Sequence, residues 1–254
     1  MDIAIVGFGT VGKHLERLSV ATGMCPVVYD KALGPRSRSA VNACGASFIC
    51  VPTNQGSDGR LVLDDVRDVL EWLKTPIVVI RSTLPIGATR ALSIEFNRPL
   101  VYVPEYIGET PWAPQRPEAD FVVLGSPDFV AAREVLRLLQ SMLGPEPVYR
   151  IVEPEYAELA KLMENSFLAL KVTFANEMAG TASAFELDYE AVRELWLLDG
   201  RMGRSHTIVT EEGGFAGKCL PKDLHNLICQ AEDASYRADL LIEVERSNRR
   251  FRSA

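Results

Sequence analysis

The sequence lacks the features that mark several classes of protein. None of its apolar runs approaches the roughly 18 residues that a membrane-spanning helix requires. Basic residues are not in excess: 27 lysines and arginines stand against 34 aspartates and glutamates, and the formal net charge is −7. Because the two signs are interspersed, the composition argues against a dedicated nucleic-acid surface and against a basic membrane patch. We expect neither nucleic acid nor a membrane as a partner.

Cysteine is scarce and follows no ligand pattern. The chain has five cysteines, an odd number, and no CxxC pair. This spacing does not predict a zinc site, so we expect no metal and free thiols in a reducing compartment. The opening residues, MDIAIVGFGTVG, have no basic segment ahead of an apolar one and read directly as a strand and a turn. We therefore expect no signal peptide and a cytoplasmic protein.

Short β-rich runs alternate with amphipathic helical segments over residues 1–150. Such alternation is typical of a doubly wound parallel sheet with helices on both faces, a Rossmann-like α/β fold. The expected strands are residues 2–6, 27–29, 47–51, 77–80, 100–103, 121–124 and 148–149. The expected helices are a segment that ends near Gly23 and residues 63–73, 88–96 and 129–143. We assign 1–150 as a dinucleotide-binding domain.

After Pro154 the pattern changes, because the β-rich runs stop. Residues 156–184 read as one long connecting helix without proline, and residues 187–198, 221–232 and 235–251 read as three more. We assign 151–254 as an all-helical second domain.

A glycine-rich turn follows the first expected strand. It comprises Gly7, Phe8, Gly9, Thr10, Val11 and Gly12. Asp30 ends the next strand, at about the 20-residue distance where a dinucleotide fingerprint places its acidic residue. Glycines let the backbone approach a pyrophosphate, and the carboxylate accepts hydrogen bonds from ribose hydroxyls. The alternative is a tight strand–helix connection without a ligand.

Asp30 would repel a 2′-phosphate, so this turn favours NAD over NADP. Lys31, Arg36 and Arg38 lie just beyond it and weaken that preference, although they also fit a solvated loop.

The stretch GGFAGKCLPKDLHNL, residues 213–227, places Cys219 between a glycine-rich loop and a helix led by Pro221. Lys218 and Lys222 flank the cysteine, and Asp223 falls in the first turn. A thiol beside a helix N-terminus and two ammonium groups should have a lowered pKa and more thiolate. The alternative is a small packing residue, the role we assign to the other cysteines: Cys25, Cys44, Cys50 and Cys229.

Five stretches, together with the turn, resemble the UDP-glucose/GDP-mannose dehydrogenase family. They are FICVPTN (48–54), RSTLPIGAT (81–89), VPEYIGE (103–109), AELAKLMENSFLALKVTFANEMA (157–179) and GGFAGKCLPKD (213–223), in the family's order over nearly the whole chain. The resemblance implies a dinucleotide-binding domain joined by a long helix to a helical domain. It also implies NAD-linked, four-electron oxidation of the primary alcohol of a sugar or nucleotide sugar to the acid, through a cysteine thioester.

The resemblance also implies roles for individual residues. Cys219 would be the nucleophile, Glu109 the general base for thioester hydrolysis, and Asp223 the group that orients a water or a lysine. Lys161 and Asn165, which share a helix face, would hold the sugar hydroxyl and the developing oxyanion. Lys161 could instead pair with Glu158 on the surface.

Further contacts are implied at the cofactor and at the substrate. Besides the turn and Asp30, the cofactor would meet Val51, Pro52, Thr53, Thr83 and Lys222. The substrate would meet Glu105, Glu109, Lys161, Asn165, Gly217 and Arg201. Arg201 aligns with an arginine that reaches the neighbouring subunit's substrate site, although a bare salt bridge would explain it as well.

The chain departs from the family in three ways. Typical members continue for over a hundred residues into a domain that grips the nucleoside diphosphate, whereas this sequence stops at Ala254. Glu211 and Glu212 would place negative charge near a pyrophosphate, and Ala216 replaces a glycine. The substrate could be smaller, a separate chain could supply the missing domain, or this could be a piece trimmed from a longer chain.

Two other functions stay open from the sequence. One is a two-electron dehydrogenase of the β-hydroxyacid kind, which also pairs a dinucleotide domain with a Lys-x-x-x-Asn helix. The other is a non-catalytic NAD-binding protein. In each case we expect a homodimer, because the long helix carries apolar residues around much of its circumference. These residues are Leu159, Leu162, Met163, Phe167, Leu168, Leu170, Val172 and Phe174.

Overall fold

The structure, a computed structural model, describes residues 1–34, 37–107 and 120–253. The described chain divides into two compact units. The first unit contains residues up to 56, 61–107 and 120–161, and the second contains 57–60 and 162–253. The assignment of functional domains as 1–150 and 151–254 stays a prediction.

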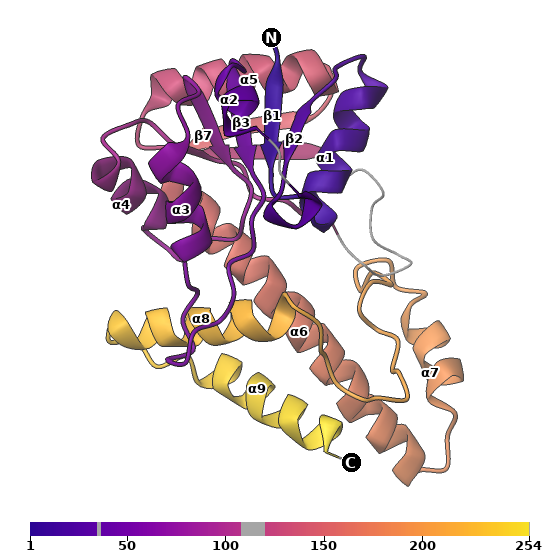
Figure 1. Ribbon diagram of the computed structural model, residues 1–254. Helices are drawn as coiled ribbons and strands as arrows, with labels where there is room; N and C mark the ends of the chain where they lie inside the picture. Colours follow the sequence, from indigo (N-terminus) through magenta and orange to yellow (C-terminus); the bar gives the residue numbers. More distant parts are fainter. Residues whose placement is uncertain (35–36, 108–119, 254) are drawn as a thin grey trace. The chain divides into compact units, whose positions relative to one another are not determined.

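The first unit is built on one seven-stranded sheet, which confirms the expected Rossmann-like α/β class (Figure 1). In sheet order the strands are β2 (Val27–Tyr29), β1 (Ile3–Val6), β3 (Ala46–Ile49), β4 (Ile77–Ile80), β5 (Val101–Tyr102), β6 (Phe121–Gly125) and β7 (Val148–Val152). Strands β1 to β5 run parallel, so the carboxyl ends of β1, β3 and β4 lie at one edge of the sheet.

The expectation of a wholly parallel sheet is wrong at one pair. Strands β5 and β6 are antiparallel, with Tyr102 opposite Gly125, and β7 then runs parallel to β6. A parallel pair needs a crossover, usually a helix. An antiparallel pair such as β5 and β6 does not need such a crossover.

Alternation along the strands divides the core of the first unit into two layers. Ile3 and Ile5 face α1 (Thr10–Ala21) and α5 (Phe129–Leu143). Ala4 and Val6 face the opposite layer, with α2 (Arg38–Asn42), α3 (Asp64–Trp72) and α4 (Ala88–Glu95). A short 3₁₀ turn, η1 (Lys31–Leu33), follows β2. Both sheet faces are therefore covered, as in other doubly wound folds.

The second unit is helical. Its elements are the later part of α6 (Pro154–Ala184), then α7 (Tyr189–Trp196), α8 (Leu220–Asp233) and α9 (Asp239–Arg252). Ala169 and Val172 of α6, Leu224 and Ile228 of α8, and Val244 of α9 form its core. Within the described residues, no helix is both long and apolar enough to span a lipid bilayer.

A short loop between β3 and α3 also belongs to the second unit. Arg60 pairs there with Asp233 at the end of α8, with 2.6 Å between Nη2 and Oδ1. Gly59 has a φ of +84°, and a Cβ on it would lie 2.3 Å from the ring of His225. The loop therefore lies against α8, and a side chain at position 59 would force it away.

Glu158 is a fully buried carboxylate near the start of α6. Its Oε2 accepts from the Gly87 amide at 2.6 Å, and its Oε1 accepts from the Thr89 amide and hydroxyl at 2.8 and 2.7 Å. The carboxylate thus satisfies donors at the N-terminus of α4, where a negative charge is favourable. Burial nevertheless raises the pKa of Glu158.

The raised pKa predicts how this residue contributes to stability as the pH changes. Just above the ordinary glutamate pKa, the folded protein still holds a proton that the unfolded chain has released, so stability falls as pH rises through this interval. Glu158→Gln removes the titration. The free energy of unfolding of the wild type minus that of the variant should therefore decrease as the pH rises above the ordinary glutamate pKa of about 4.3. Urea denaturation at several pH values measures this difference.

Glu155→Gln is the matched control. Hydrogen bonding from Arg90 lowers the pKa of Glu155, so the same difference should increase with pH below about pH 4.5. A difference for Glu158 that increased across its interval would contradict the assignment.

Candidate functional site

The glycine turn after β1 is shaped by close backbone contacts. Gly7 has a φ of +98°, and a Cβ on it would lie 2.6 Å from the carbonyl of Cys50. A Cβ on Gly12 would lie 2.1 Å from the Gly7 oxygen. A Cβ on Gly9 would meet nothing within 4 Å in the described part of the chain. Gly7 and Gly12 are thus required for packing, whereas the space beside Gly9 is open to a ligand.

Helix α1 begins directly after Gly9, and the described chain provides no side-chain cap there. The first amides of a helix lack partners within the helix and attract anions. The turn can therefore accept a phosphate or pyrophosphate on the amides of Thr10, Val11 and Gly12.

The Asp30 carboxylate is held in place at the end of β2. Its Oδ2 accepts from the Phe8 amide at 2.6 Å, and its Oδ1 accepts from the Ala32 amide at 2.8 Å. Asp30 is half-buried. A fixed acid beside the glycine turn is the arrangement with which dinucleotide-binding folds hold a ribose.

Two of the three basic residues near Asp30 are held against α3. Lys31 pairs with Asp68 at 2.8 Å and with Asp65 at 3.4 Å. The guanidinium carbon of Arg38 lies 4.8 Å from the centre of the Trp72 ring. Arg36 lies outside the described residues.

The loops after β3 and β4 are joined to each other. The Thr53 hydroxyl donates to the Thr83 carbonyl at 2.9 Å, and the Ser82 hydroxyl donates to the Val51 carbonyl at 2.6 Å. Val51, Pro52, Thr53 and Thr83 therefore lie together, at the edge of the sheet where doubly wound folds bind ligands.

In the second unit, four predicted residues come together at the start of α8. Asp223 is fully buried. Its Oδ2 accepts from Asn165 Nδ2 at 2.6 Å, and its Oδ1 lies 2.6 Å from Lys222 Nζ. Cys219 is the N-cap residue of α8, and its carbonyl accepts from the Asp223 amide at 3.0 Å. Pro221 is the second residue of the helix, rather than the first as expected.

The five cysteines, all in described residues, are free of disulfides and differ in exposure. Cys219 is exposed, whereas burial raises the pKa of Cys50 to about 12, so that thiol is inert near neutral pH. Burial likewise raises the pKa of Cys44 and Cys229. Cys25 is exposed between α1 and β2, so its assignment to packing is wrong.

Lys161 lies on α6, one helical turn before Asn165. It is only 4% exposed, and its Nζ lies 4.8 Å from the centre of the Tyr106 ring. The alternative of a surface pair between Glu158 and Lys161 is wrong as to location, because both side chains are buried.

Two further predicted substrate residues, Glu105 and Gly217, lie on loops. Glu105 accepts from the Ile107 amide at 2.8 Å, and Gly217 is exposed with a φ of +82°. Glu109 lies outside the described residues. Glu211 and Glu212, which depart from the family pattern, are exposed to solvent.

Comparisons with known proteins identify a family and a fold. Residues 155–250 match the central domain of the UDP-glucose/GDP-mannose dehydrogenase family. A UDP-glucose 6-dehydrogenase from Pseudomonas aeruginosa is 33% identical over 219 residues, which are 80% of this chain and 48% of that protein. The structure of a UDP-glucose dehydrogenase from Pyrobaculum islandicum has a TM-score of 0.82 at 26% identity and covers 98% of this chain and 68% of that one. The chain belongs to the UDP-glucose/GDP-mannose dehydrogenase family.

A third relative of the same family is a GDP-mannose 6-dehydrogenase from Pseudomonas putida. It is 27% identical over 230 residues, which are 82% of this chain and 51% of that protein. The chain therefore spans about half the length of these two curated relatives. The matched central domain includes Lys161, Asn165, Arg201, Cys219 and Asp223.

Arg201 forms an ion pair with a residue of its own loop. Its side chain is 83% exposed and pairs with Asp199, with 2.5 Å between Nη2 and Oδ2. This is the salt bridge that the sequence left open as the alternative. Two backbone carbonyls of the same loop, those of Met202 and Gly203, accept from Lys171 Nζ at 3.2 Å.

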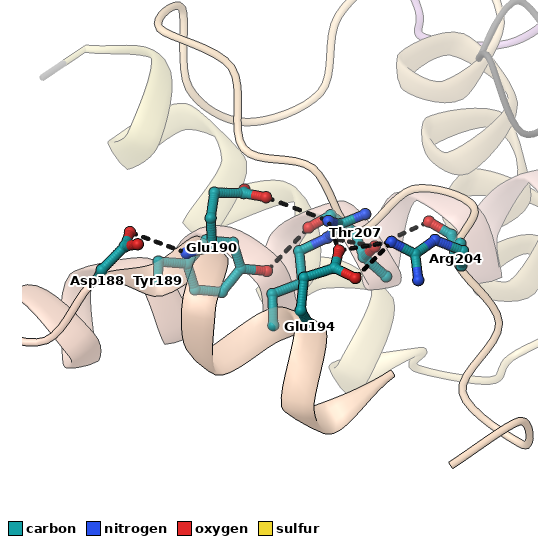
Figure 2. A network of polar contacts seen from close by, with 7 residues as sticks. Asp188, Tyr189, Glu190, Glu194, Arg204 and Thr207 are labelled. Carbon is teal, nitrogen blue, oxygen red and sulfur yellow. Dashed lines mark hydrogen bonds and ion pairs between the residues drawn. The ribbon is translucent and has the colours of Figure 1, made fainter. Parts of the chain in front are cut away.

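Sequence reasoning missed the group that holds the end of this loop against α7 (Figure 2). Arg193 is only 3% exposed, and its Nε donates to the Thr207 hydroxyl at 2.9 Å. That hydroxyl donates to the Arg204 carbonyl at 2.8 Å, and Tyr189 donates to the Thr207 carbonyl at 2.9 Å. Glu194 then bridges Arg193 and Arg204. The apolar neighbours of Arg193 on α7, Val192 and Leu195, are exposed, so the hydrophobic pattern gave no signal that the arginine faces inward.

The Thr207 hydroxyl offers a test of this loop anchor. Thr207→Val keeps the shape of the side chain but removes the hydroxyl that accepts from the buried Nε of Arg193. An unsatisfied buried group costs about 1–3 kcal/mol, so the free energy of unfolding should fall by that amount. Urea denaturation measures the change. Thr181→Val is the control, because that exposed hydroxyl only bonds the Glu177 carbonyl within α6. Equal effects of the two variants would refute the anchor.

Proposed function

We propose that this protein oxidises the primary alcohol of a sugar or nucleotide sugar to the carboxylate, with two equivalents of NAD. The observation that carries the proposal is the exposed Cys219 thiol at the start of α8, one helical turn from the buried Asp223–Asn165 pair. The overall reaction converts one alcohol, two NAD⁺ and one water into one carboxylate, two NADH and three protons.

The first unit supports NAD as the cofactor, which when bound accepts a hydride in each oxidation. The α1 amides after Gly9 would hold the pyrophosphate, and Asp30 would accept from the ribose. Asp30 also disfavours a 2′-phosphate, and both Lys31 and Arg38 have partners on α3. Val51, Pro52, Thr53 and Thr83 would contact the remaining part of the dinucleotide, and the family resemblance implies a cofactor contact for Lys222 as well.

The second unit supports covalent catalysis by Cys219. After the first oxidation, the thiolate would attack the aldehyde carbon and form a C–S bond. Loss of hydride from the resulting thiohemiacetal would leave a thioester, and water would then release the acid and the free thiol. Placement at a helix N-terminus favours the thiolate. Because a thiol nucleophile must stay reduced, we propose a cytoplasmic location.

Other residues would hold charge and protons around the reacting carbon. Lys161 and Asn165, one turn apart on α6, would donate to the developing oxyanion. Asp223 already fixes the amide of Asn165 and the ammonium of Lys222, so it would act as an orienting group. Glu109 would activate the hydrolytic water, as the family resemblance implies.

The substrate proposal follows from the names of the relatives, which act on UDP-glucose or GDP-mannose. Glu105, Gly217 and the exposed Arg201 would contact the sugar or its carrier. Since the chain spans about half of these relatives, we propose a primary alcohol of this class, carried on a nucleotide or in smaller form, within sugar or polysaccharide metabolism.

A homodimer is proposed from the exposed face of α6. Met163, Phe167 and Phe174 lie at helical spacing on one face and are 62%, 59% and 46% exposed. An apolar helix face left in water favours association with a second copy.

The catalytic proposal predicts the products of wild-type and variant protein. Purified protein, NAD⁺ and a panel of nucleotide sugars, sugars and sugar phosphates should give two NADH for each acid formed. Cys219→Ser should reduce acid formation by at least about a thousandfold while NAD binding stays within about twofold, because the serine hydroxyl is a far weaker nucleophile. One NADH per product would favour a two-electron dehydrogenase, and NAD binding without turnover would favour a non-catalytic protein.

The dimer proposal predicts a mass change in light scattering. Wild-type protein should have twice the mass of the chain, and Phe167→Glu should shift it toward one chain by placing a charge in the apolar contact. Leu240→Glu on α9 is the control, because Leu240 is similarly exposed, at 63%. A wild-type mass of one chain at working concentration would contradict the proposal.

A further inference from the structure

The loop that leads to Cys219 is tied to α9 by one side-chain amide. Asn248 Oδ1 accepts from the Phe215 amide at 2.6 Å, and Asn248 Nδ2 donates to the Phe215 carbonyl at 3.0 Å. Asn248 is 8% exposed. One side chain therefore satisfies both backbone groups of a single loop residue, as a neighbouring strand would do in a sheet.

A second amide holds the adjacent residue from α6. Asn176 Oδ1 accepts from the Gly214 amide at 3.0 Å, while its Nδ2 donates to the Val172 carbonyl at 2.8 Å. The Phe215 side chain itself is 4% exposed and belongs to the core of the second unit. The loop is thus anchored by apolar burial and by three side-chain hydrogen bonds at two consecutive residues.

The two glycines before Phe215 let the backbone reach this position. Gly213 and Gly214 have φ values of +64° and +56°. A Cβ on Gly214 would lie 2.3 Å from Asn248 Oδ1, and a Cβ on Gly213 would lie 2.6 Å from the Phe251 carbonyl. The loop therefore lies directly on α9, at the level of Asn248.

From these contacts we infer that Asn248, supported by Asn176, is a positioning residue that sets the place of Cys219 at the N-terminus of α8. This inference rests on the proposed role of Cys219 as the reactive thiol. Only three exposed residues, Ala216 to Lys218, separate the anchored Phe215 from the cysteine. With one end fixed by Asn248 and the other by the first turn of α8, this short segment has little freedom to move the cysteine.

Positioning affects reactivity because the amides at a helix N-terminus favour a thiolate only when the sulfur stays close to them. Access to the sulfur is not limiting, because Cys219 is already exposed. Loss of the Asn248 bonds should therefore lower the reactivity of the thiol rather than raise it.

The test compares Asn248→Ala with a matched asparagine in the first unit. Asn42 also bonds two backbone groups, donating to the Trp72 carbonyl at 3.0 Å and accepting from the Lys74 amide at 2.8 Å. Asn42→Ala should thus remove the same kinds of bond away from the cysteine loop. For each protein, iodoacetamide labelling of Cys219 and Cys25 is followed across pH by peptide mass spectrometry, with the melting temperature recorded alongside.

We expect both variants to lower the melting temperature. Only Asn248→Ala should slow labelling of Cys219 at neutral pH, by about tenfold, and move its pH profile toward that of an ordinary cysteine near pH 8.5. Labelling of Cys25 should not change in either variant. An unchanged Cys219 profile in folded Asn248→Ala would overturn the inference, since a residue needed only for stability would give that result.

Hydrogen exchange separates this inference from the proposed function. Amides of residues 213–219 should exchange about tenfold faster in Asn248→Ala than in the wild type, equivalent to about 1.4 kcal/mol of lost protection, but not in Asn42→Ala. If Asn248→Ala does not fold, Asn176→Ala takes its place; it removes the bond to the Gly214 amide together with the bond to the Val172 carbonyl within α6. Failure of Cys219→Ser to affect acid formation would defeat the proposed function, whereas unaltered exchange at 213–219 would defeat the positioning role alone.

Discussion

The buried Asp223 carboxylate constrains how α6 and α8 pack in the second unit. A carboxylate removed from water must have donors within the protein, or its burial costs several kcal/mol. Asn165 of α6 and the neighbouring Lys222 supply those donors. The same pairing ties α6 to the first turn of α8, whose N-cap residue is Cys219. Packing of the helical unit and placement of the thiol therefore depend on one buried charge.

A common device recurs at the loops that carry the candidate functional residues. In each case a polar side chain from another element bonds the backbone of the loop. Asp30 holds the Phe8 amide, Thr53 holds the Thr83 carbonyl, and Asn248 holds Phe215. Bonds of this kind, from a neighbouring loop or from a helix, fix the backbone of these loops, so the loops can present exposed groups without losing their shape. The loop that carries Arg201 is held in the same way, because the Tyr189 hydroxyl of α7 donates to the Thr207 carbonyl.

Cysteines of this chain lie in different environments, and so do its buried carboxylates. Burial makes Cys50 inert with a pKa of about 12, while Cys219 lies exposed at a helix start. Glu158, with no exposure, serves the N-terminus of α4, whereas Asp223 serves the group around Cys219. Residues of one chemical type therefore have different roles, and neighbouring groups and exposure decide which role each has.

The sequence by itself determined the class of the fold and most of its elements. The spacing of apolar residues and the positions of proline and glycine are local properties of the sequence. From them, all seven strands and the long helices were predicted within a few residues of their observed bounds. The sequence also indicated the glycine turn with Asp30 and the grouping of Cys219, Asn165 and Asp223. Only the tertiary structure decided the reversed direction of β6 and β7, the exposure of Cys25, and the inward orientation of Arg193. It also decided the pairing of Asn248 with Phe215. These features depend on contacts between residues that lie far apart in the chain or on opposite faces of one helix, and no local pattern encodes which of those contacts will form.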